Sequence, residues 1–307
     1  MLKDIRDGAF EELYRLIKKD RKIILISVDQ GALIMDKIGK DFPNNLIRSS
    51  IAEQNSINFA AGLAKGGFKP YVYLISPFIA RAFEQVKINI CSMKLKINII
   101  GSGSGFAYAS DGVTHYFLED YGIFKNLPNI NIHATHDYNS AKLAISESYK
   151  SNVGGLIKLE KGQFVNLKDK YKSKIEEIKK GKKTLLITYG YMSQFILKEI
   201  VNHKSFKKDE LGLAVINSLI PLDIKKMKNI FNKYKKVLFI EETPLNSSVF
   251  QSLSDQYFIG LKYKRILHGQ FANLEFTRLA GSRNELLGIN NLDKTSIIKK
   301  IKKINAD

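Results

Sequence analysis

The sequence is poor in cysteine and in acidic residues, and it has no long apolar segment. Its 307 residues include one cysteine, Cys91, which excludes an internal disulfide and a zinc site built from cysteines. Because disulfide scaffolds belong to oxidising compartments, we expect a reducing, cytoplasmic location. Residues 1–10 are charged, and no run approaches the roughly 18 apolar residues that a membrane span needs. We therefore expect neither a signal peptide nor a membrane-embedded chain.

Acidic residues number 30 against 49 lysines and arginines, so the net charge is +19 at pH 7. Such an excess is typical of proteins that neutralise nucleic-acid phosphates. Here it is mostly lysine on segments that resemble linkers or termini: residues 161–183 hold nine lysines and three acids, and residues 299–303 form a second run. Arginine is scarce, and aromatic residues do not interleave with the basic runs. The distribution favours a solvated surface that attracts anionic ligands over a nucleic-acid-binding protein.

The hydrophobic pattern predicts an α/β fold with two consecutive α/β domains and largely parallel sheets. Short β-branched runs alternate with helix-length segments. The lysine-rich residues 166–183 show no strand pattern, so we expect a linker containing a helix, between a domain at 1–165 and a smaller one at 184–307. Strands are predicted at Ile23–Val28, Pro70–Ile75, Ile97–Ile100, Ile130–His133, Gly155–Leu159, Thr184–Thr188, Leu213–Ile216 and Val237–Ile240.

The sequence lacks the motifs of several common catalytic and binding sites. The glycine-rich residues 101–105 (GSGSG) complete neither a dinucleotide fingerprint nor a P-loop. The five histidines are scattered and form no H-E-x-x-H pattern, so no metal site is predicted from protein ligands. The sequence has no G-x-S-x-G nucleophile elbow. Cys91 lies on an apolar segment, so we expect its thiol to be packed and not to act as a nucleophile. We expect His133 and His136 to be structural or surface residues.

A series of short sequence motifs, called words below, resembles one family. Residues 48–55 read RSSIAEQN, and AAGLA, KPY, PFIARAFEQ and DGVTH follow in order at 60–64, 69–71, 77–85 and 111–115. Together they resemble the pyrimidine-binding domain of the transketolase family of thiamine diphosphate enzymes. Words at 29–31 (DQG), 155–159 (GLIKL), 186–190 (LITYG), 220–223 (IPLD) and 240–242 (IEE) also fit. The resemblance covers nearly the whole chain and implies a transketolase-like fold, with a pyrimidine-binding domain at 1–165 and a transketolase C-terminal domain at 184–307.

One family motif is missing. Full-length transketolases begin with a domain that binds the cofactor diphosphate through Mg²⁺ and carries a G-D-G followed by an Asn; here the Gly before Asp7-Gly8 and Asp111-Gly112 is absent. The resemblance therefore implies the C-terminal subunit of a split transketolase. Its partner would be a separate N-terminal subunit that carries the G-D-G motif and ligates Mg²⁺. An assembly with two copies of each chain, a heterotetramer, is expected.

Glu53 is the residue on which the resemblance places the central chemistry. Residues 50–53 (SIAE) also spell a capping box, in which Glu53 would only bond the backbone of Ser50. The family implies instead that the carboxyl binds the pyrimidine nitrogen of thiamine diphosphate and favours the imino tautomer. The exocyclic nitrogen can then take the proton from the thiazolium carbon. A dry pocket that raises the carboxyl pKa would suit this role.

Other cofactor contacts follow from the same resemblance. Phe78 would stack on the aminopyrimidine, because an aromatic face matches a flat heterocycle. Asp29 ends a predicted strand, where α/β proteins hold ligands, and is expected near the cofactor. Arg81 is assigned to the cofactor site within a word that fits the deoxyxylulose-phosphate synthase branch and other split transketolases. Glu84 and Gln85 on the same segment are expected to stabilise the helix or a subunit interface.

The sugar-binding residues are also implied by the family. Asp111 and His115 correspond to residues that touch the hydroxyls of the donor ketose, and a histidine of near-neutral pKa can move protons during carbon–carbon cleavage. The alternative without a role in binding is that Asp111 forms an Asx turn and His115 lies on the surface. Gly103 stands where sugar-phosphate transketolases carry a phosphate-binding His. Arg6 matches a frequent phosphate-binding Arg, so an anionic sugar stays open.

Several functions remain open at this point. The favoured one is transfer of a two-carbon ketol unit from a ketose to an aldose, as in transketolase. The alternatives are the beta subunit of a 2-oxoacid dehydrogenase and a deoxyxylulose-phosphate-synthase-like enzyme. A basic non-catalytic or nucleic-acid-binding protein on the same fold is the alternative of a different class.

Overall fold

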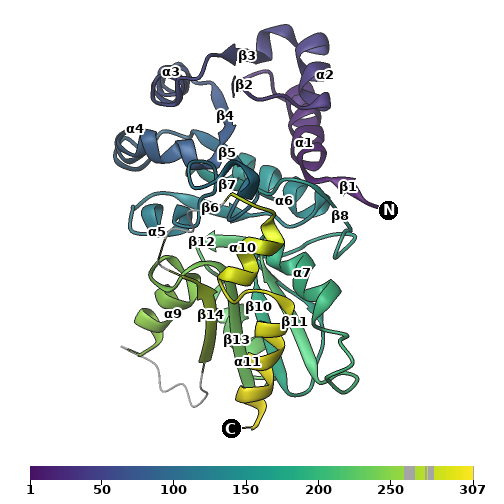
Figure 1. The fold of residues 1–307 in the computed structure, drawn as a ribbon. Helices are drawn as coiled ribbons and strands as arrows, with labels where there is room; N and C mark the ends of the chain where they lie inside the picture. The colour runs from purple at the N-terminus through teal and green to yellow at the C-terminus, as the bar shows by residue number, and fades with distance from the viewer. Residues whose placement is uncertain (259–266, 274, 276–279, 307) are drawn as a thin grey trace. The chain divides into compact units, whose positions relative to one another are not determined.

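The computed structural model describes residues 1–258, 267–273, 275 and 280–306, and it divides the chain into two compact units. Unit 1 comprises residues 1–104 and 124–171, and unit 2 comprises residues 105–123 and 172–307. Figure 1 shows both as α/β structures. The predicted fold class, two α/β units with largely parallel sheets, is confirmed. The eight predicted strands are present, and the sheets also contain strands that were not predicted, including Leu46–Ser49 and Leu267–Ala272.

Unit 1 is built on a parallel sheet. Its strands lie in the order β3 (Leu46–Ser49), β2 (Ile23–Val28), β4 (Lys69–Ile75), β5 (Asn98–Ser102), β7 (Gly155–Leu159) and β6 (Asn131–Ala134). Strands β2, β5 and β7 are buried along their whole length, which fits their mostly apolar sequences. A small antiparallel pair, β1 (Lys3–Asp4) with β8 (Gln163–Phe164), ties the start of the unit to its end.

Helices cover both faces of this sheet. On one side, α1 (Ile5–Lys19), α2 (Leu33–Asp41) and α6 (Tyr138–Lys150) bury an apolar core that includes Phe10, Leu13 and Tyr73. On the other side lie α3 (Glu53–Lys65) and α4 (Phe83–Gln85), with the 3₁₀ helix η2 (Ser76–Ala82) before α4 and the π-helix η3 (Val86–Ser92) after it. The two sides are visible in Figure 1 around β2 and β4.

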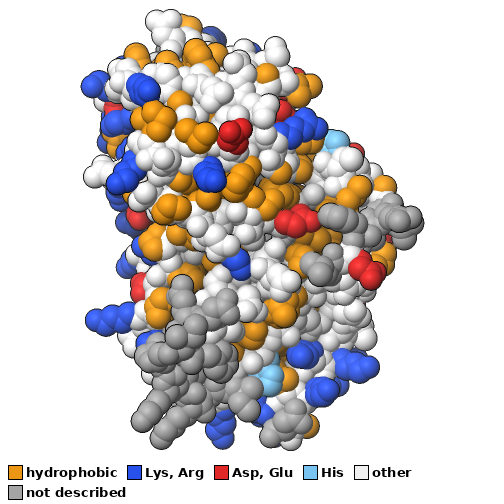
Figure 2. Space-filling model, turned by 90° about the vertical axis from the view of Figure 1, so that its left-hand side faces the viewer, with side chains coloured by type: hydrophobic (Ala, Val, Ile, Leu, Met, Phe, Trp, Pro, Cys, Tyr) orange, Lys and Arg blue, Asp and Glu red, His pale blue; other side chains and the backbone are white. Residues whose placement is uncertain are grey.

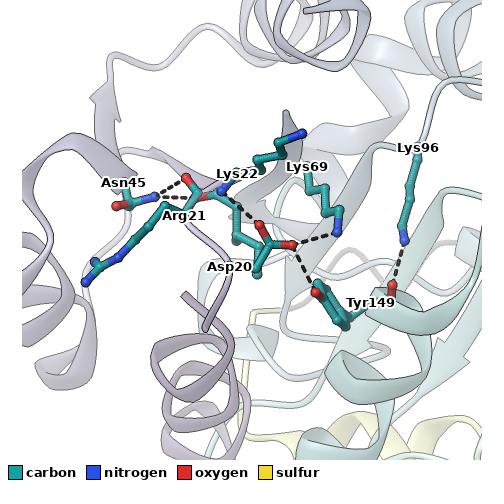
Figure 3. Close-up of polar contacts among 8 residues, drawn as sticks. Asp20, Arg21, Lys22, Asn45, Lys69, Lys96 and Tyr149 are labelled. Atoms are coloured by element: carbon teal, nitrogen blue, oxygen red, sulfur yellow. Dashed lines mark hydrogen bonds and ion pairs between the residues drawn. The ribbon is translucent and has the colours of Figure 1, made fainter. Parts of the chain in front are cut away.

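A polar cluster closes the amino edge of the unit 1 sheet (Figure 3). The Asp20 carboxylate, just after α1, accepts hydrogen bonds from Lys69 Nζ at 2.6 Å and from Tyr149 Oη at 2.9 Å. Lys96 Nζ donates to the Tyr149 carbonyl at 2.5 Å. Burial alone would raise the pKa of Asp20, but the bonds from Lys69 and its neighbours outweigh burial and lower it. The cluster joins α1, β4 and α6 at the end of the sheet opposite the strand carboxyl ends.

Unit 2 contains a second sheet. Strands β14 (Leu267–Ala272), β13 (Lys236–Pro244), β10 (Thr184–Thr188) and β11 (Leu211–Ile216) run parallel, and β9 (Ile175–Lys179) pairs antiparallel with β11. A short strand β12 (Ser218–Ile220) follows β11. The helices of unit 2 include α7 (Tyr191–Glu199), α8 (Ile224–Phe231), α9 (Val249–Phe258), α10 (Arg283–Ile289) and α11 (Lys294–Ala306).

Two segments differ from the sequence-based expectations. Residues 166–183, expected to be a linker with a helix, contain the edge strand β9 instead. Its sequence, IEEIK, buries Ile175 and Glu176 and leaves its other residues partly exposed, which hides the strand pattern among lysines. Residues 105–123, expected within the first domain, make their contacts with unit 2. They include the 3₁₀ helix η4 (Ala109–Asp111) and most of α5 (Asp120–Phe124).

Candidate functional site

Glu53 is the first residue of α3, at the carboxyl edge of the unit 1 sheet. The residue is only 5% exposed. Ala52 is the N-cap of the helix and makes no side-chain cap bond, so Glu53 occupies N1, two positions short of the N3 position that a capping box needs. The alternative reading of residues 50–53 as a capping box is therefore wrong. The carboxylate sits where the helix dipole favours negative charge and has no capping role.

Arg81 and Phe78 lie beside Glu53. Arg81 Nη1 is 3.7 Å from Glu53 Oε1, and the Arg81 guanidinium carbon lies 4.5 Å from the centre of the Phe78 ring. Within the described part of the chain, this ion pair is the only polar contact of the Glu53 carboxylate. The Arg81 side chain is 60% exposed, so the pair opens toward solvent on one side. The structure thus brings three of the predicted cofactor residues together.

The segment that carries Phe78 and Arg81 is tied to α3. It leaves β4 through Pro77, which is placed in the first turn of η2 where a missing N–H costs nothing. Gln54 Nε2 donates to the Arg81 carbonyl at 2.9 Å, and Asn89 Nδ2 donates to Asn58 Oδ1 at 2.9 Å. These bonds fix η2 and η3 against α3. Sequence reasoning assigned Gln54 no role, although it stands in the RSSIAEQN word next to Glu53.

Asp29 follows β2 at the same sheet edge as Glu53, as expected from its position. It is exposed and adopts a left-handed backbone with φ of 50°, which is unusual for a residue other than glycine. Its amide donates to the Ser49 carbonyl at the end of β3, at 3.4 Å. No contact between Asp29 and Glu53 is found among the described residues. Its assignment to the cofactor site stays a prediction.

Arg6 is held by a neighbour in its own sequence. Its guanidinium Nη2 donates to Asp4 Oδ2 at 2.9 Å, and Asp4 caps α1 by accepting from the Arg6 amide. The hydrogen bond to Asp4 raises the pKa of Arg6 above its ordinary value. The guanidinium is half-buried, so part of it remains accessible to an anion. Its predicted contact with a sugar phosphate stays a prediction.

Asp111 and His115 lie on one loop of unit 2. Gly112, between them, has a φ of 75°, and the His115 amide donates to its carbonyl at 3.0 Å. Asp111 is exposed and His115 is partly exposed. The His115 Nδ1 lies 2.8 Å from Thr114 Oγ1. Both side chains are therefore accessible on a defined turn, whereas Glu53, Phe78 and Arg81 belong to unit 1.

The buried histidines and the cysteine of unit 1 have structural surroundings. Cys91 lies in η3, and burial raises its pKa to about 11, which makes the thiol unreactive. His136 is fully buried, and burial lowers its pKa. His133 is also buried, which fits the structural role expected for it. Across the described residues, no group of three or more His, Cys, Asp and Glu side chains could hold a metal ion, and no helix is long and apolar enough to cross a bilayer.

A match to the sequence profile of a known family identifies the family of this chain. The family described as "Transketolase, pyrimidine binding domain" matches residues 3–156. The chain belongs to this family. The matched residues of the transketolase-family domain include all the site residues predicted above: Arg6, Asp29, Glu53, Phe78, Arg81, Asp111 and His115.

Relatives of this transketolase-family chain include a synthase and a transketolase subunit. A 1-deoxy-D-xylulose-5-phosphate synthase of Dictyoglomus thermophilum is 28% identical over 234 residues, which cover 74% of this chain and 37% of that protein. An apulose-4-phosphate transketolase subunit of Actinobacillus succinogenes is 29% identical over 271 residues, which cover 84% of each chain. The chain therefore spans less than half of the synthase and most of the transketolase subunit.

Solved structures share the fold. A split-gene transketolase, described as an inactive beta4 tetramer, has a TM-score of 0.84 at 20% identity and covers 98% of this chain and 97% of its own. Transketolase of Campylobacter jejuni has a TM-score of 0.75 at 16% identity, with 98% of this chain and 47% of that chain covered. The transketolase-like fold predicted from the sequence words is confirmed.

Proposed function

We propose that this chain is the pyrimidine-binding subunit of a thiamine diphosphate-dependent transketolase. It would transfer a two-carbon ketol unit from a ketose to an aldose together with a separate subunit. The observation that carries the proposal is the buried Glu53 carboxylate at the start of α3, which has no capping role and a single ionic neighbour among the described residues. Burying a carboxylate without hydrogen-bond partners costs free energy, so such a group is typical of a ligand-binding site.

The residues around Glu53 fit the pyrimidine part of the cofactor. A pyrimidine presents a ring nitrogen to a carboxyl and a flat face to an aromatic ring, and Glu53 and Phe78 are held together by Arg81. A second polar atom of this segment also lacks a partner: Gln85 Oε1 is buried without a hydrogen bond in the described structure. A bound donor group would satisfy it.

Each side chain would have a distinct task. When bound, thiamine diphosphate supplies a nucleophilic carbon for addition to the ketose carbonyl. Glu53 would hold a proton at the pyrimidine nitrogen and pass it to and from the ring. Phe78 would orient the ring by stacking. Arg81 would fix the Glu53 carboxylate and cover the outer side of the site, because its guanidinium contacts both Glu53 and Phe78.

The Asp111–His115 loop would act on the sugar. A carboxylate and an imidazole on one turn can accept and donate hydrogen bonds to adjacent hydroxyls, and the imidazole can carry a proton near neutral pH. Asp111 and His115 are both accessible, which a substrate contact requires. Arg6 is the candidate for an anionic sugar, since its guanidinium is charged at every working pH.

A partner subunit would supply the diphosphate and Mg²⁺ site. The chain carries no G-D-G motif, and the described residues hold no metal-ligand cluster. A relative that aligns with 84% of this chain is itself named as a subunit of a transketolase. Figure 2 shows apolar side chains on the side of unit 1 that carries α3 and α4, where Ile51, Phe59, Ile88 and Met93 are exposed. An apolar surface next to a half-formed site favours burial against another subunit.

Reconstitution tests this function. The purified chain should show no ketol transfer by itself and should bind thiamine diphosphate weakly, because the diphosphate and Mg²⁺ contacts lie on the partner. Activity should appear when a subunit with the G-D-G motif is added, and a panel of free and phosphorylated ketoses would identify the donor. Full activity from this chain without a partner would contradict the proposal.

A synthase activity is the second candidate, because several relatives are 1-deoxy-D-xylulose-5-phosphate synthases. A 1-deoxy product requires a donor whose transferred carbons lack the terminal hydroxyl, which points to a three-carbon 2-oxoacid. The same reconstituted pair should therefore be given pyruvate and an aldose phosphate. Release of CO₂ with formation of a 1-deoxyketose would assign the chain to the synthase branch. Transfer from a ketose without CO₂ release would assign it to transketolase.

A further inference from the structure

Two adjacent glutamates, Glu241 and Glu242, lie in the last half of strand β13, and their side chains contact different elements. Glu241 accepts hydrogen bonds from the amides of Val249, at 2.8 Å, and Phe250, at 2.9 Å, so it caps the start of α9. Glu242 makes no such cap. It forms an ion pair with Arg283, the first residue of α10. Sequence reasoning placed Glu242 in the IEE word without a role and did not single out Arg283.

The Glu242–Arg283 pair is bidentate and mostly buried. Arg283 Nε donates to Glu242 Oε1 at 2.9 Å, and Arg283 Nη2 donates to Glu242 Oε2. The side chains are 8% and 13% exposed for Glu242 and Arg283. The guanidinium carbon of Arg283 lies 3.8 Å from the centre of the Tyr191 ring on α7. A fork-to-fork pair stacked on an aromatic ring has one well-defined geometry.

The same carboxylate holds the loop that carries Asp111 and His115. Glu242 Oε1 accepts a hydrogen bond from the Phe106 amide at 3.1 Å. The adjacent Gly105 has a φ of 56°, and a β-carbon there would lie 2.5 Å from Glu242 Oε2. The carboxylate therefore packs directly on the loop backbone. This contact is made entirely within unit 2.

Further bonds tie the same loop to its surroundings. The Phe117 amide donates to the Gly105 carbonyl at 3.1 Å, which closes the base of the loop. The Gly281 amide, just before α10, donates to the Ala109 carbonyl at 3.1 Å. Thr243 Oγ1 donates to the Leu118 carbonyl. The loop is thus held at both ends by β13 and in the middle by the approach to α10.

A buried ion pair is a poor means of stabilising a fold, because desolvation cancels most of its attraction. It does specify geometry, since two charged forks accept only one arrangement. We propose that Glu242 and Arg283 are positioning residues for the donor sugar: they fix the 105–118 loop so that Asp111 and His115 face the sugar hydroxyls. The inference rests on the proposed function for what the loop binds. The positioning itself rests on the contacts of Glu242.

Hydrogen exchange tests the positioning on the chain without substrate. In Glu242→Gln and Arg283→Lys, the amides of residues 105–118 should exchange about tenfold faster or more, because a charge-assisted bond to the Phe106 amide is weakened. The matched control is Glu177→Gln. Glu177 is similarly buried and accepts from Tyr234 Oη at 2.6 Å and Lys233 Nζ at 2.9 Å, away from this loop. Unchanged exchange at 105–118 in both variants would overturn the proposal.

Kinetics of the reconstituted pair test the link to the sugar. In both variants kcat/KM for the ketose should fall about tenfold or more, whereas proton–deuterium exchange at the thiazolium carbon of the cofactor should match wild type. Glu177→Gln should match wild type in both measurements. A loss of cofactor exchange in step with turnover would mean a general structural effect and would overturn the proposal. Absence of cofactor exchange in the wild-type pair would instead contradict the proposed function, with the amide exchange result still deciding the positioning.

Discussion

The Glu53 carboxylate is placed by the fold and left without a structural task. Its helix starts without a side-chain cap, and Arg81 contacts it at 3.7 Å, which is longer than a hydrogen bond. A charged group with this little support contributes little to stability where it stands. Replacing it should therefore separate chemistry from folding more cleanly than most buried substitutions do.

For Glu53→Gln we expect an intact fold and intact assembly, with turnover lower by orders of magnitude. Glutamine fills the same space but cannot hold and release the proton at the pyrimidine nitrogen. Proton–deuterium exchange at the thiazolium carbon measures the effect directly. The control is Glu84→Gln, a carboxyl on the neighbouring segment that is not buried. Equal exchange rates in wild type and Glu53→Gln would refute the assignment of the catalytic carboxyl.

For His115→Ala we expect turnover of the sugar to fall about a hundredfold or more, because a proton carrier and a hydroxyl contact are lost. Binding of thiamine diphosphate should be unaffected, since the loop is assigned to the sugar. Titration of the cofactor and steady-state kinetics separate the two effects. His203→Ala is the control, because His203 lies on another turn and accepts a hydrogen bond from the Ser205 amide. A collapse of cofactor affinity in His115→Ala would show the loop to be misassigned.

Asp20 offers a test of stability that is independent of function. Its pKa is lowered from the ordinary value of 3.8, so its bonds stabilise the fold above about pH 4 and are lost as the pH falls through the lowered pKa. Asp20→Asn should cost about 1–2 kcal/mol at pH 7 and much less near pH 2, measured by urea unfolding. Asp36→Asn, which breaks the exposed pair with Arg48, should cost almost nothing at either pH. A cost for Asp20→Asn that is independent of pH would contradict this account.

At the scale of elements, strands were easier to predict from sequence than the segments between them. Gly155–Leu159 and Thr184–Thr188 have the predicted limits, since both strands are buried throughout. The edge strand β9 was missed because its sequence, IEEIK, has three charged residues and lies in a lysine-rich stretch. The cap of α3 was not predictable, because the residues 50–53 fit both a capping box and a helix in which Glu53 is an uncapped first residue. Local pattern could not distinguish them.

The 105–118 loop depends on glycine at its base. Gly105→Ala combines a left-handed backbone with a β-carbon 2.5 Å from Glu242 Oε2, so we expect a loss of about 2–3 kcal/mol. Gly67→Ala has a similar backbone, with φ of 84°, and open space around the β-carbon, so it should cost about 1 kcal/mol. Thermal unfolding of both variants measures the difference. Equal costs would mean that Glu242 does not pack on the loop as described.

The site as a whole was only partly predictable. The contact of Glu53 with Arg81 joins residues 28 positions apart, and the sequence words named both because they resemble a family in which they belong together. Glu242 stands in the IEE motif without an assigned role, because its contact with the loop is with a backbone amide more than 130 positions away. A hydrogen bond from a main-chain amide requires no particular side chain at the donor residue, so the sequence does not reveal it. Such contacts become visible only when the chain is folded.

At the scale of the molecule, we expect two copies of this chain and two of the partner in the active assembly. A cofactor held between unlike subunits with twofold symmetry gives two equivalent sites. Light scattering of the reconstituted, active complex measures its mass, and this chain without its partner is the control. An active complex with one copy of each chain would contradict the expectation.

The path of the chain between its two units limits how this protein can be divided or recombined. Residues 105–123 leave unit 1 to join unit 2, and the chain returns to unit 1 until residue 171. A single junction placed near residue 165 would therefore give a hybrid whose Asp111–His115 loop came from one parent and whose Glu242 came from the other. Exchange of intact modules would need three junctions, at 104/105, 123/124 and 171/172. Under the proposed function, inheritance of sugar specificity by simple crossover would be restricted to parents that agree across this interrupted segment.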